Sequence, residues 1–160
     1  MPENNYTMQL SVLIKNILFT VLIPGSVGVY VPRWLGAQYA GQADWWSLLA
    51  WPLLLFGAGI LLLCIFDFMH KGEGTPFPLD PPKNLVTGRL YRRTRNPMYV
   101  GVLAMIAGWA LWFSSATLAG YWLAVALVFN LFILIVEEPS LKKQFGEQYA
   151  EYCRQAPRWL

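Results

Sequence analysis

The sequence predicts an all-α integral membrane protein with about four transmembrane helices and a C-terminal amphipathic helix. Three observations lead to this fold class. Hydrophobic residues make up 56% of the 160 residues and charged residues only 13%, against roughly 25% charged in soluble domains. The mean hydropathy is +0.41, and the apolar residues gather into runs long enough to cross a bilayer. A chain of this length is expected to form one domain, residues 1–160.

Four apolar runs are the predicted spans, at residues 8–31, 46–66, 99–113 and 118–136. In the first run we expect a kink at Pro24; the run is too long for the rival interpretation, a cleaved signal peptide. In the second run, Gly57 and Gly59 permit close helix contact. Residues 114–117 form a short uncharged turn, so the last two runs should make an antiparallel hairpin.

Polar segments separate these runs. Residues 32–44 are expected to form a short connection, and the proline-rich residues 71–98 an extended loop. Pro139 fits the first turn of a further helix. Apolar residues recur on one face of that helix, so it should lie on the membrane surface or against the loop and not cross the bilayer: Leu141, Phe145, Tyr149 and Tyr152.

Basic residues predict the orientation of the chain in the membrane, because cytoplasmic loops carry an excess of Lys and Arg. The connection at 32–44 contains only Arg33, and the turn at 114–117 contains no basic residue. Both termini, the 71–98 loop and the C-terminal helix are therefore expected on the cytoplasmic side, in a bacterial inner membrane. The basic residues that favour this orientation are Lys71, Lys83, Arg89, Arg92, Arg93, Arg95, Lys142, Lys143, Arg154 and Arg158.

Several site classes are excluded by the residue inventory. Cys64 and Cys153 are too far apart for a zinc motif, and one histidine, His70, cannot build a histidine metal site alone. No phosphate-binding glycine motif and no basic repeat for nucleic acid is present. Asp67 and His70 at the end of the second run are interpreted as interfacial polar residues in preference to catalytic ones.

The stretch GRLYRRTRNPMYVG, residues 88–101, is the strongest candidate for a functional site. It opens the third run, whereas Glu137 and Glu138 close the fourth. Because the two helices are antiparallel, Arg95 and these carboxylates should converge at the membrane edge. A charge within the bilayer costs up to roughly 2.5–3.5 kcal/mol, so such residues are usually paired and often functional. A purely structural clamp, with the basic loop held by anionic lipid, is the competing interpretation.

Two motifs carry a family resemblance. TGRLYRRTRNPMYVG, followed after the hairpin by EEPSLKKQFGEQYAEYCRQAPRW, resembles the isoprenylcysteine carboxyl methyltransferase and phospholipid methyltransferase superfamily. The similarity covers roughly residues 72–159. It implies S-adenosylmethionine-dependent methyl transfer at the cytoplasmic membrane face, without a Rossmann domain, to a small or lipid-like acceptor drawn from the surrounding bilayer.

The resemblance also implies roles for single residues, within a cofactor region at 83–101 and 137–158. Glu137 would hold the ammonium of the cofactor, and Gly101 would let the helix approach the ligand. Arg95 and Glu138 would orient the acceptor as the catalytic residues. The remaining expected cofactor contacts are Lys83, Asn84, Leu85, Val86, Tyr91, Asn96, Pro97, Met98 and Tyr99.

The chain also departs from the superfamily pattern. Asn96 stands where relatives carry histidine, and an amide cannot act as a titrating acid or base. Ile133, with Asn130 nearby, stands where prenylcysteine methyltransferases carry an arginine, which argues against methylation of a prenylcysteine carboxyl group. The chain has fewer spans than some relatives, so its lipid groove is either more open or completed by a second copy.

Alternatives remain open at this stage. A sterol-type membrane reductase using NADPH has a similar C-terminal half, and a non-enzymatic adaptor could retain the fold. The acceptor could be an amine, a thiol, a ring or a carboxylate. Arg158 could pair with Glu137, Glu138 or a lipid phosphate. Tyr149 is expected to pack and could face the site, and the two cysteines are expected to be inert.

Overall fold

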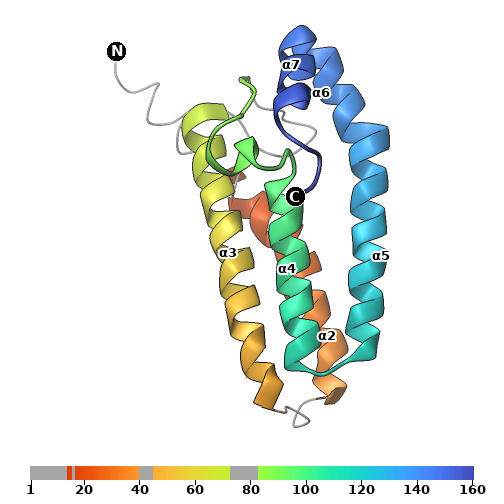
Figure 1. Cartoon of the computed structure of the whole chain (residues 1–160). Helices are drawn as coiled ribbons and strands as arrows, with labels where there is room; N and C mark the ends of the chain where they lie inside the picture. Colours follow the sequence, from red (N-terminus) through yellow and green to blue (C-terminus); the bar gives the residue numbers. More distant parts are fainter. Residues whose placement is uncertain (1–13, 16, 40–44, 73–82) are drawn as a thin grey trace.

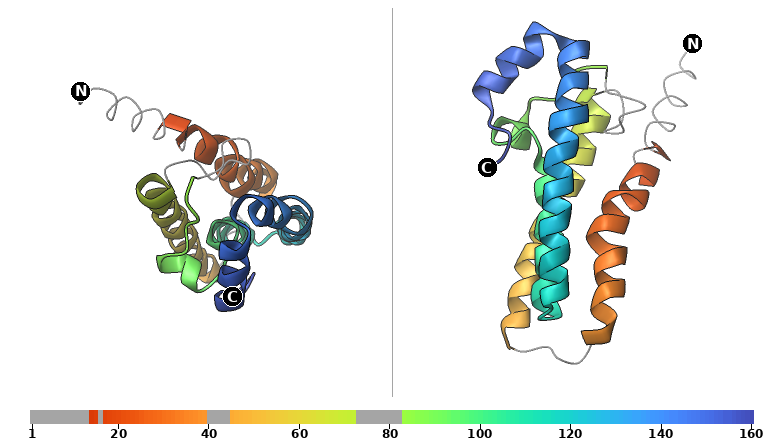
Figure 2. Two further views of the ribbon diagram at one scale, coloured as in Figure 1. Left: turned by 90° about the horizontal axis from the view of Figure 1, so that it is seen from above. Right: turned by 90° about the vertical axis from the view of Figure 1, so that its right-hand side faces the viewer.

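The computed structural model describes residues 14, 15, 17–39, 45–72 and 83–160. In this part of the chain four helical rods alternate in direction, and two short helices cover one end of them (Figure 1 and Figure 2). The all-α fold class is confirmed. The expected extended path of the prolines at 76–82 lies outside the described residues.

The first rod, Ile17–Tyr39, continues eight residues beyond the predicted end at residue 31. Next to Pro24 the helix is irregular: Ile23 is a turn, and a π-helical turn follows at Ser26–Tyr30. Helix α2, Val31–Gly36, and a 3₁₀ turn then continue the rod to Tyr39. The predicted end of the span at residue 31 and the polar connection from residue 32 are therefore wrong.

Contacts from distant helices explain why the first rod continues through Pro32. Proline has no N–H, so it cannot donate a hydrogen bond to the carbonyl of Val27 or Gly28 one turn earlier. The hydroxyl of Tyr121 donates to the Val27 oxygen (3.1 Å), and the indole of Trp109 donates to the Gly28 oxygen (3.1 Å). These side chains satisfy carbonyls that would otherwise be costly in an apolar layer.

The second rod is built on α3, Ala50–Asp67, which a π-helical turn extends at Phe68–Gly72. A Cβ atom on Gly57 would lie 2.5 Å from the carbonyl oxygen of Gly101, whereas one on Gly59 would meet nothing within 4 Å. The predicted close contact is confirmed at Gly57 and wrong at Gly59. It joins α3 to α4, Pro97–Trp112.

The predicted hairpin is confirmed by α4 and α5, Ala116–Phe132, which a short turn connects. Ser115 caps α5, because its hydroxyl accepts a hydrogen bond from the Leu118 N–H (3.3 Å). Helix α4 begins at Pro97, a position where the missing N–H does no harm. The turn therefore fixes both helices side by side and leaves their other ends free to carry a site.

Three rods are long and apolar enough to cross a membrane: Ile17–Tyr39, Ser47–His70 and Ala116–Phe145. Helix α4, which corresponds to the predicted third span, is a shorter apolar helix of 16 residues, about 24 Å long. The rod Ala116–Phe145 has 30 residues, about 45 Å, and exceeds a hydrocarbon core of about 30 Å. Its last part, with Glu137 and Glu138, can therefore reach the polar edge of the membrane.

The C-terminal amphipathic segment consists of two helices where one was predicted. Helix α6, Glu138–Phe145, ends at Gly146, and α7 covers Glu147–Gln155. Gly146 has φ +53° and ψ −124°, a conformation that is strained for any residue with a side chain. The turn folds α7 back over the loop before α4, where the Tyr152 hydroxyl donates to the carbonyl of Tyr91 (2.7 Å).

Candidate functional site

Three segments meet at one end of the rods: the loop before α4, the start of α6 and the last residues of the chain (Figure 1). Nη1 of Arg95 lies 3.1 Å from Oε1 of Glu138, across the open end of the hairpin. The predicted convergence of arginine and carboxylate is confirmed. The two side chains are partly buried, at 13% and 21% exposure.

Glu138 is held by a second arginine. Arg158 donates from Nε to Oε1 (2.7 Å) and from Nη2 to Oε2 (2.9 Å), the two-pronged geometry that favours arginine–carboxylate pairs. Of the partners considered for Arg158, the structure has Glu138. The hydrogen bonds to this carboxylate raise the pKa of Arg158 above its usual value, so the guanidinium stays charged.

Glu137 is bound differently from its neighbour. Its Oε2 accepts a hydrogen bond from the hydroxyl of Tyr99 (2.8 Å), and the Tyr99 ring lies 4.6 Å from the ring of Phe129, centroid to centroid. Glu137 is the last residue of a π-helical turn, Ile133–Glu137, and such turns are frequent at functional sites. The two adjacent glutamates thus face different partners.

Arg95 is fixed by more than its ion pair. Its backbone N–H donates to the carbonyl of Pro157 (2.9 Å), and Nη1 lies 2.8 Å from the sulfur of Cys153 and 3.4 Å from the hydroxyl of Tyr149. Burial raises the pKa of the Tyr149 and Tyr152 hydroxyls, so both remain protonated. Tyr149 therefore faces the site, and Cys153, predicted to be inert, contacts its central arginine.

The segment 156–160, here named the terminal strap, crosses this site. The carbonyl of Arg158 accepts hydrogen bonds from the Thr94 hydroxyl (2.9 Å) and from the Asn96 amide (3.0 Å). The indole N–H of Trp159 donates to Oδ1 of Asn130 on α5 (3.2 Å). Sequence reasoning missed Thr94 and Trp159, because their partners are a backbone carbonyl and a residue of a distant helix.

The other predicted cofactor contacts are spread over the same end of the molecule. Lys83 and Asn84 are exposed, and Leu85 and Met98 are partly buried. Gly101 lies against α3, which explains the absence of a side chain at this position independently of any ligand. The remaining members are buried: Val86, Tyr91, Asn96 and Pro97.

Positions that depart from the superfamily pattern have structural partners. Asn96 uses its amide to hold the strap. Ile133 is a buried apolar side chain, and Asn130 is bound by Trp159. Neither position provides a cation.

Asp67 and His70 each contact a neighbouring side chain. Asp67 is buried, with the Nε of Arg89 3.4 Å from its Oδ1. His70 is exposed and stacks on Phe66 at a centroid distance of 4.0 Å. Within the described residues, no cluster of three potential ligands could hold a metal ion. Asp67 is thus enclosed next to an arginine, whereas His70 lies on the exposed side of the helix end.

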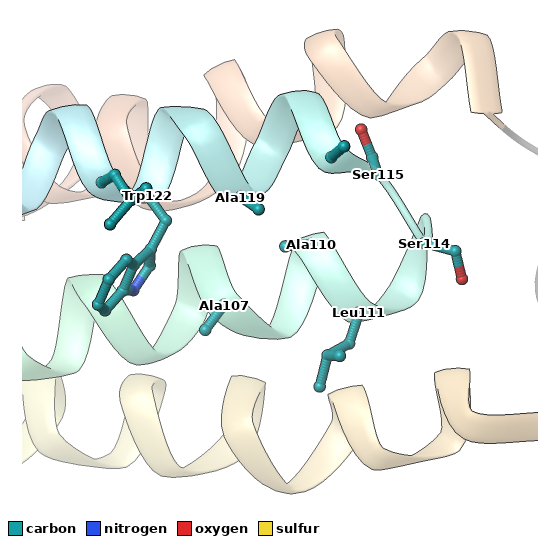
Figure 3. Close-up of a pocket in the computed structure, with 9 residues that line it drawn as sticks. Ala107, Ala110, Leu111, Ser114, Ser115, Ala119 and Trp122 are labelled. Carbon is teal, nitrogen blue, oxygen red and sulfur yellow. The ribbon is translucent and has the colours of Figure 1, made fainter.

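An open apolar groove of about 630 Å³ lies at the opposite end of the hairpin, between α4 and α5 (Figure 3). Small side chains line it, among them Ala107, Ala110 and Ala119, with Trp122 at one end. None of the residues that line this groove is charged. The groove therefore lacks the charged side chains found at the end with Arg95 and Glu138.

Comparison with known proteins agrees with this geometry. A family model described as phospholipid methyltransferase matches residues 46–148, a region that includes Arg95, Glu137 and Glu138. No curated protein and no solved structure matches the chain. The family match covers more than half of the 160 residues and confirms the resemblance seen in the two motifs. The chain, a membrane methyltransferase, belongs to the phospholipid methyltransferase family.

Proposed function

We propose that this methyltransferase uses S-adenosylmethionine and methylates a small or lipid-like acceptor at the cytoplasmic face of the membrane. The observation that carries the proposal is the ion pair between Arg95 and Glu138 beside the hydrogen bond from Tyr99 to Glu137, within the family-matched region. The basic loop and the C-terminal helices lie at this same end (Figure 1), as the positive-inside rule requires of a cytoplasmic face.

The side chains present suit the cofactor. The carboxylate of Glu137, oriented by the Tyr99 hydroxyl, complements the ammonium group of the cofactor by a charge-assisted hydrogen bond. Nε of Arg95 is buried and has no hydrogen-bond partner among the described residues, and a buried donor of this kind calls for an acceptor atom. A bound polar ligand would supply one.

Further residues of the cofactor site are proposed from their place in the same motifs. Asn96, Pro97 and Met98 lead into α4 beside Tyr99 and would line the pocket, together with Tyr91. The backbone of residues 83–86 would cover the adenosine. Gly101 would shape the pocket only through the close approach of α4 to α3.

S-adenosylmethionine supplies an electrophilic methyl group, and its in-line displacement needs positioning and the exclusion of water. Glu138, fixed by Arg158, holds the guanidinium of Arg95, which would orient the acceptor. Tyr99 keeps Glu137 in place, and Phe129 adds an apolar wall beside it. Asn96 binds the strap and takes no part in proton transfer.

Equilibrium binding to the detergent-purified protein tests the cofactor. We expect radiolabelled S-adenosylmethionine to bind, S-adenosylhomocysteine to compete with it, and NADPH not to bind. Glu137→Gln keeps the size and the contact with Tyr99 but loses the charge, so cofactor affinity should fall about 10- to 100-fold. The matched control, Glu147→Gln on the exposed face of α7, should bind normally.

The results can contradict the proposal in two ways. Binding of NADPH without binding of S-adenosylmethionine would indicate a reductase. If Glu137→Gln binds S-adenosylmethionine as tightly as the wild type does, the Glu137 carboxylate does not bind the cofactor. The acceptor is then sought by mass spectrometry of membrane lipids with and without the protein, as species that gain the mass of one methylene group.

A further inference from the structure

Trp159 and Asn130 form a contact that the proposed methyl transfer does not explain. The second half of α5 is apolar except for Asn130, and an amide is costly at this depth unless it is paired. The indole of Trp159, which can only donate, satisfies the amide oxygen at 3.2 Å. The pair therefore holds the end of the strap against α5.

This contact reaches from the polar site into the apolar layer. Arg158, the neighbour of Trp159, binds Glu138. Asn130 precedes Glu137 by seven residues in the same rod, which places it about 10 Å deeper along the helix. Phe129, beside Asn130, contacts the Tyr99 ring that holds Glu137. The indole thus lies below the carboxylates.

The same part of α5 faces the bilayer. Leu127 is 60% exposed and Leu131 is 46% exposed, as expected for side chains that contact lipid acyl chains. An acceptor with its apolar body in the membrane and its reactive head beside Arg95 would extend past the level of Asn130 and Trp159. The partly buried indole is fixed to α5 at that level.

We propose that Trp159 is a specificity-determining residue of the methyl transfer, which limits the bulk of the lipid-like acceptor admitted to the site from the bilayer side of α5. The inference rests on the proposed function. Asn130 is a positioning residue in it, because it acts only by holding the indole. A large, rigid ring at this place excludes acceptors with bulky apolar bodies and admits slender ones.

The test compares Trp159→Ala with Trp159→Phe, both purified and supplied with a total membrane-lipid extract and methyl-labelled S-adenosylmethionine. Labelled lipids are separated and identified by mass spectrometry. Trp159→Ala should label bulkier species, with a rise of about 10-fold or more relative to the wild-type product. Trp159→Phe keeps most of the volume but loses the hydrogen bond to Asn130, so its profile should lie between those of the wild type and Trp159→Ala. Asn130→Ala removes the same bond and should shift the profile about as far as Trp159→Phe does.

Controls separate this inference from a general loss of structure. Trp34→Ala removes an exposed indole from α2, at the other end of the molecule (Figure 1), and should leave the profile unchanged. Cofactor affinity should be equal in all variants. If Trp159→Ala does not fold, Trp159→Leu provides the reduced volume for the same comparison.

Two results would overturn the inference: an unchanged product profile in an active Trp159→Ala or Trp159→Leu protein, or a uniform loss of labelling with cofactor binding intact. The second would mean that the indole binds the acceptor and does not exclude it. Failure of the proposed function is recognised separately, because the wild-type protein itself would then bind no S-adenosylmethionine or label no lipid.

Discussion

The two arms of the hairpin, α4 and α5, are both apolar but have opposite surroundings. Helix α4 contacts α2, α3 and α5, and Gly101 and Gly108 approach α3 closely. Helix α5 turns large side chains outward, among them Leu123 at 63% exposure. Helix α4 is thus fixed inside the protein, whereas α5 lies at the lipid boundary.

This difference gives separate roles to α4, here called the internal arm, and to α5, here called the boundary arm. The internal arm fixes Arg95 and Tyr99 at its beginning, and the boundary arm carries Asn130, Glu137 and Glu138 along the bilayer. A site shared between them is rigid on one side and accessible to lipid on the other. Such an arrangement suits an enzyme whose acceptor arrives through the membrane.

The largest effect is expected where the two arms are tied together. Replacing the guanidinium in Arg95→Met leaves Glu138 with a single arginine, and breaking a largely buried ion pair costs about 3–5 kcal/mol. We expect near-complete loss of methyl transfer and a marked fall in the unfolding temperature in detergent. Arg154→Met, which removes an exposed arginine of α7, should change neither; nearly normal methyl transfer by Arg95→Met would remove Arg95 from the site.

A smaller effect is expected from separating the internal arm from α3. Gly57→Ala places a methyl group against the backbone of Gly101, and overpacking of this kind costs about 1–3 kcal/mol. Thermal unfolding in detergent should show the loss. Gly59→Ala is the matched control on the same helix, with open space at its Cβ, and should be neutral or slightly stabilising. Equal unfolding temperatures for the two variants would contradict the close packing of α3 and α4.

The hydrogen bond between α5 and the first rod should contribute less to stability. Tyr121→Phe removes the hydrogen bond to the carbonyl of Val27, and interhelical hydrogen bonds in membranes contribute about 0.6 kcal/mol on average. We expect a fall of that size in the free energy of unfolding. Tyr30→Phe, at an exposed tyrosine of the first rod, should have no effect. If Tyr121→Phe is as stable as the wild type, the Val27 carbonyl has found another donor.

The smallest effect is expected on the lipid side of α5. Leu127→Ala removes three carbon atoms from an exposed side chain and should change stability by less than about 0.5 kcal/mol. Ile106→Val removes one carbon atom from a buried side chain of α4 and should cost more, about 0.5–1.5 kcal/mol. Chemical unfolding of both variants in one detergent checks the order, and the reverse order would mean that α5 packs against protein.

The hairpin and the polar site follow from local sequence signals. The short turn after Trp112 requires antiparallel helices, and this topology brings Arg95 to Glu138 without knowledge of any side-chain geometry. The family motifs then name the same residues. These features were predictable because each depends on residues that are near in sequence or joined by one turn.

Other features depend on partners that no local pattern reveals. Where the helix continues past Pro32, Trp109 and Tyr121 supply donors to the carbonyls of Gly28 and Val27. The strap is held through the carbonyl of Arg158, and a carbonyl is common to every residue. Gly146 is a different case: the glycine after Phe145 was a visible signal for a break between two helices.

The π-helical turn at Ile133–Glu137 makes the site sensitive to insertion and deletion. Each residue of an α-helix turns the chain by about 100°. Deleting one residue from this turn would leave the boundary arm intact but rotate Glu137 and everything after it, away from Tyr99 and Arg95. In this chain, the number of residues between Asn130 and the two glutamates therefore matters more to these contacts than the identity of the apolar residues between them.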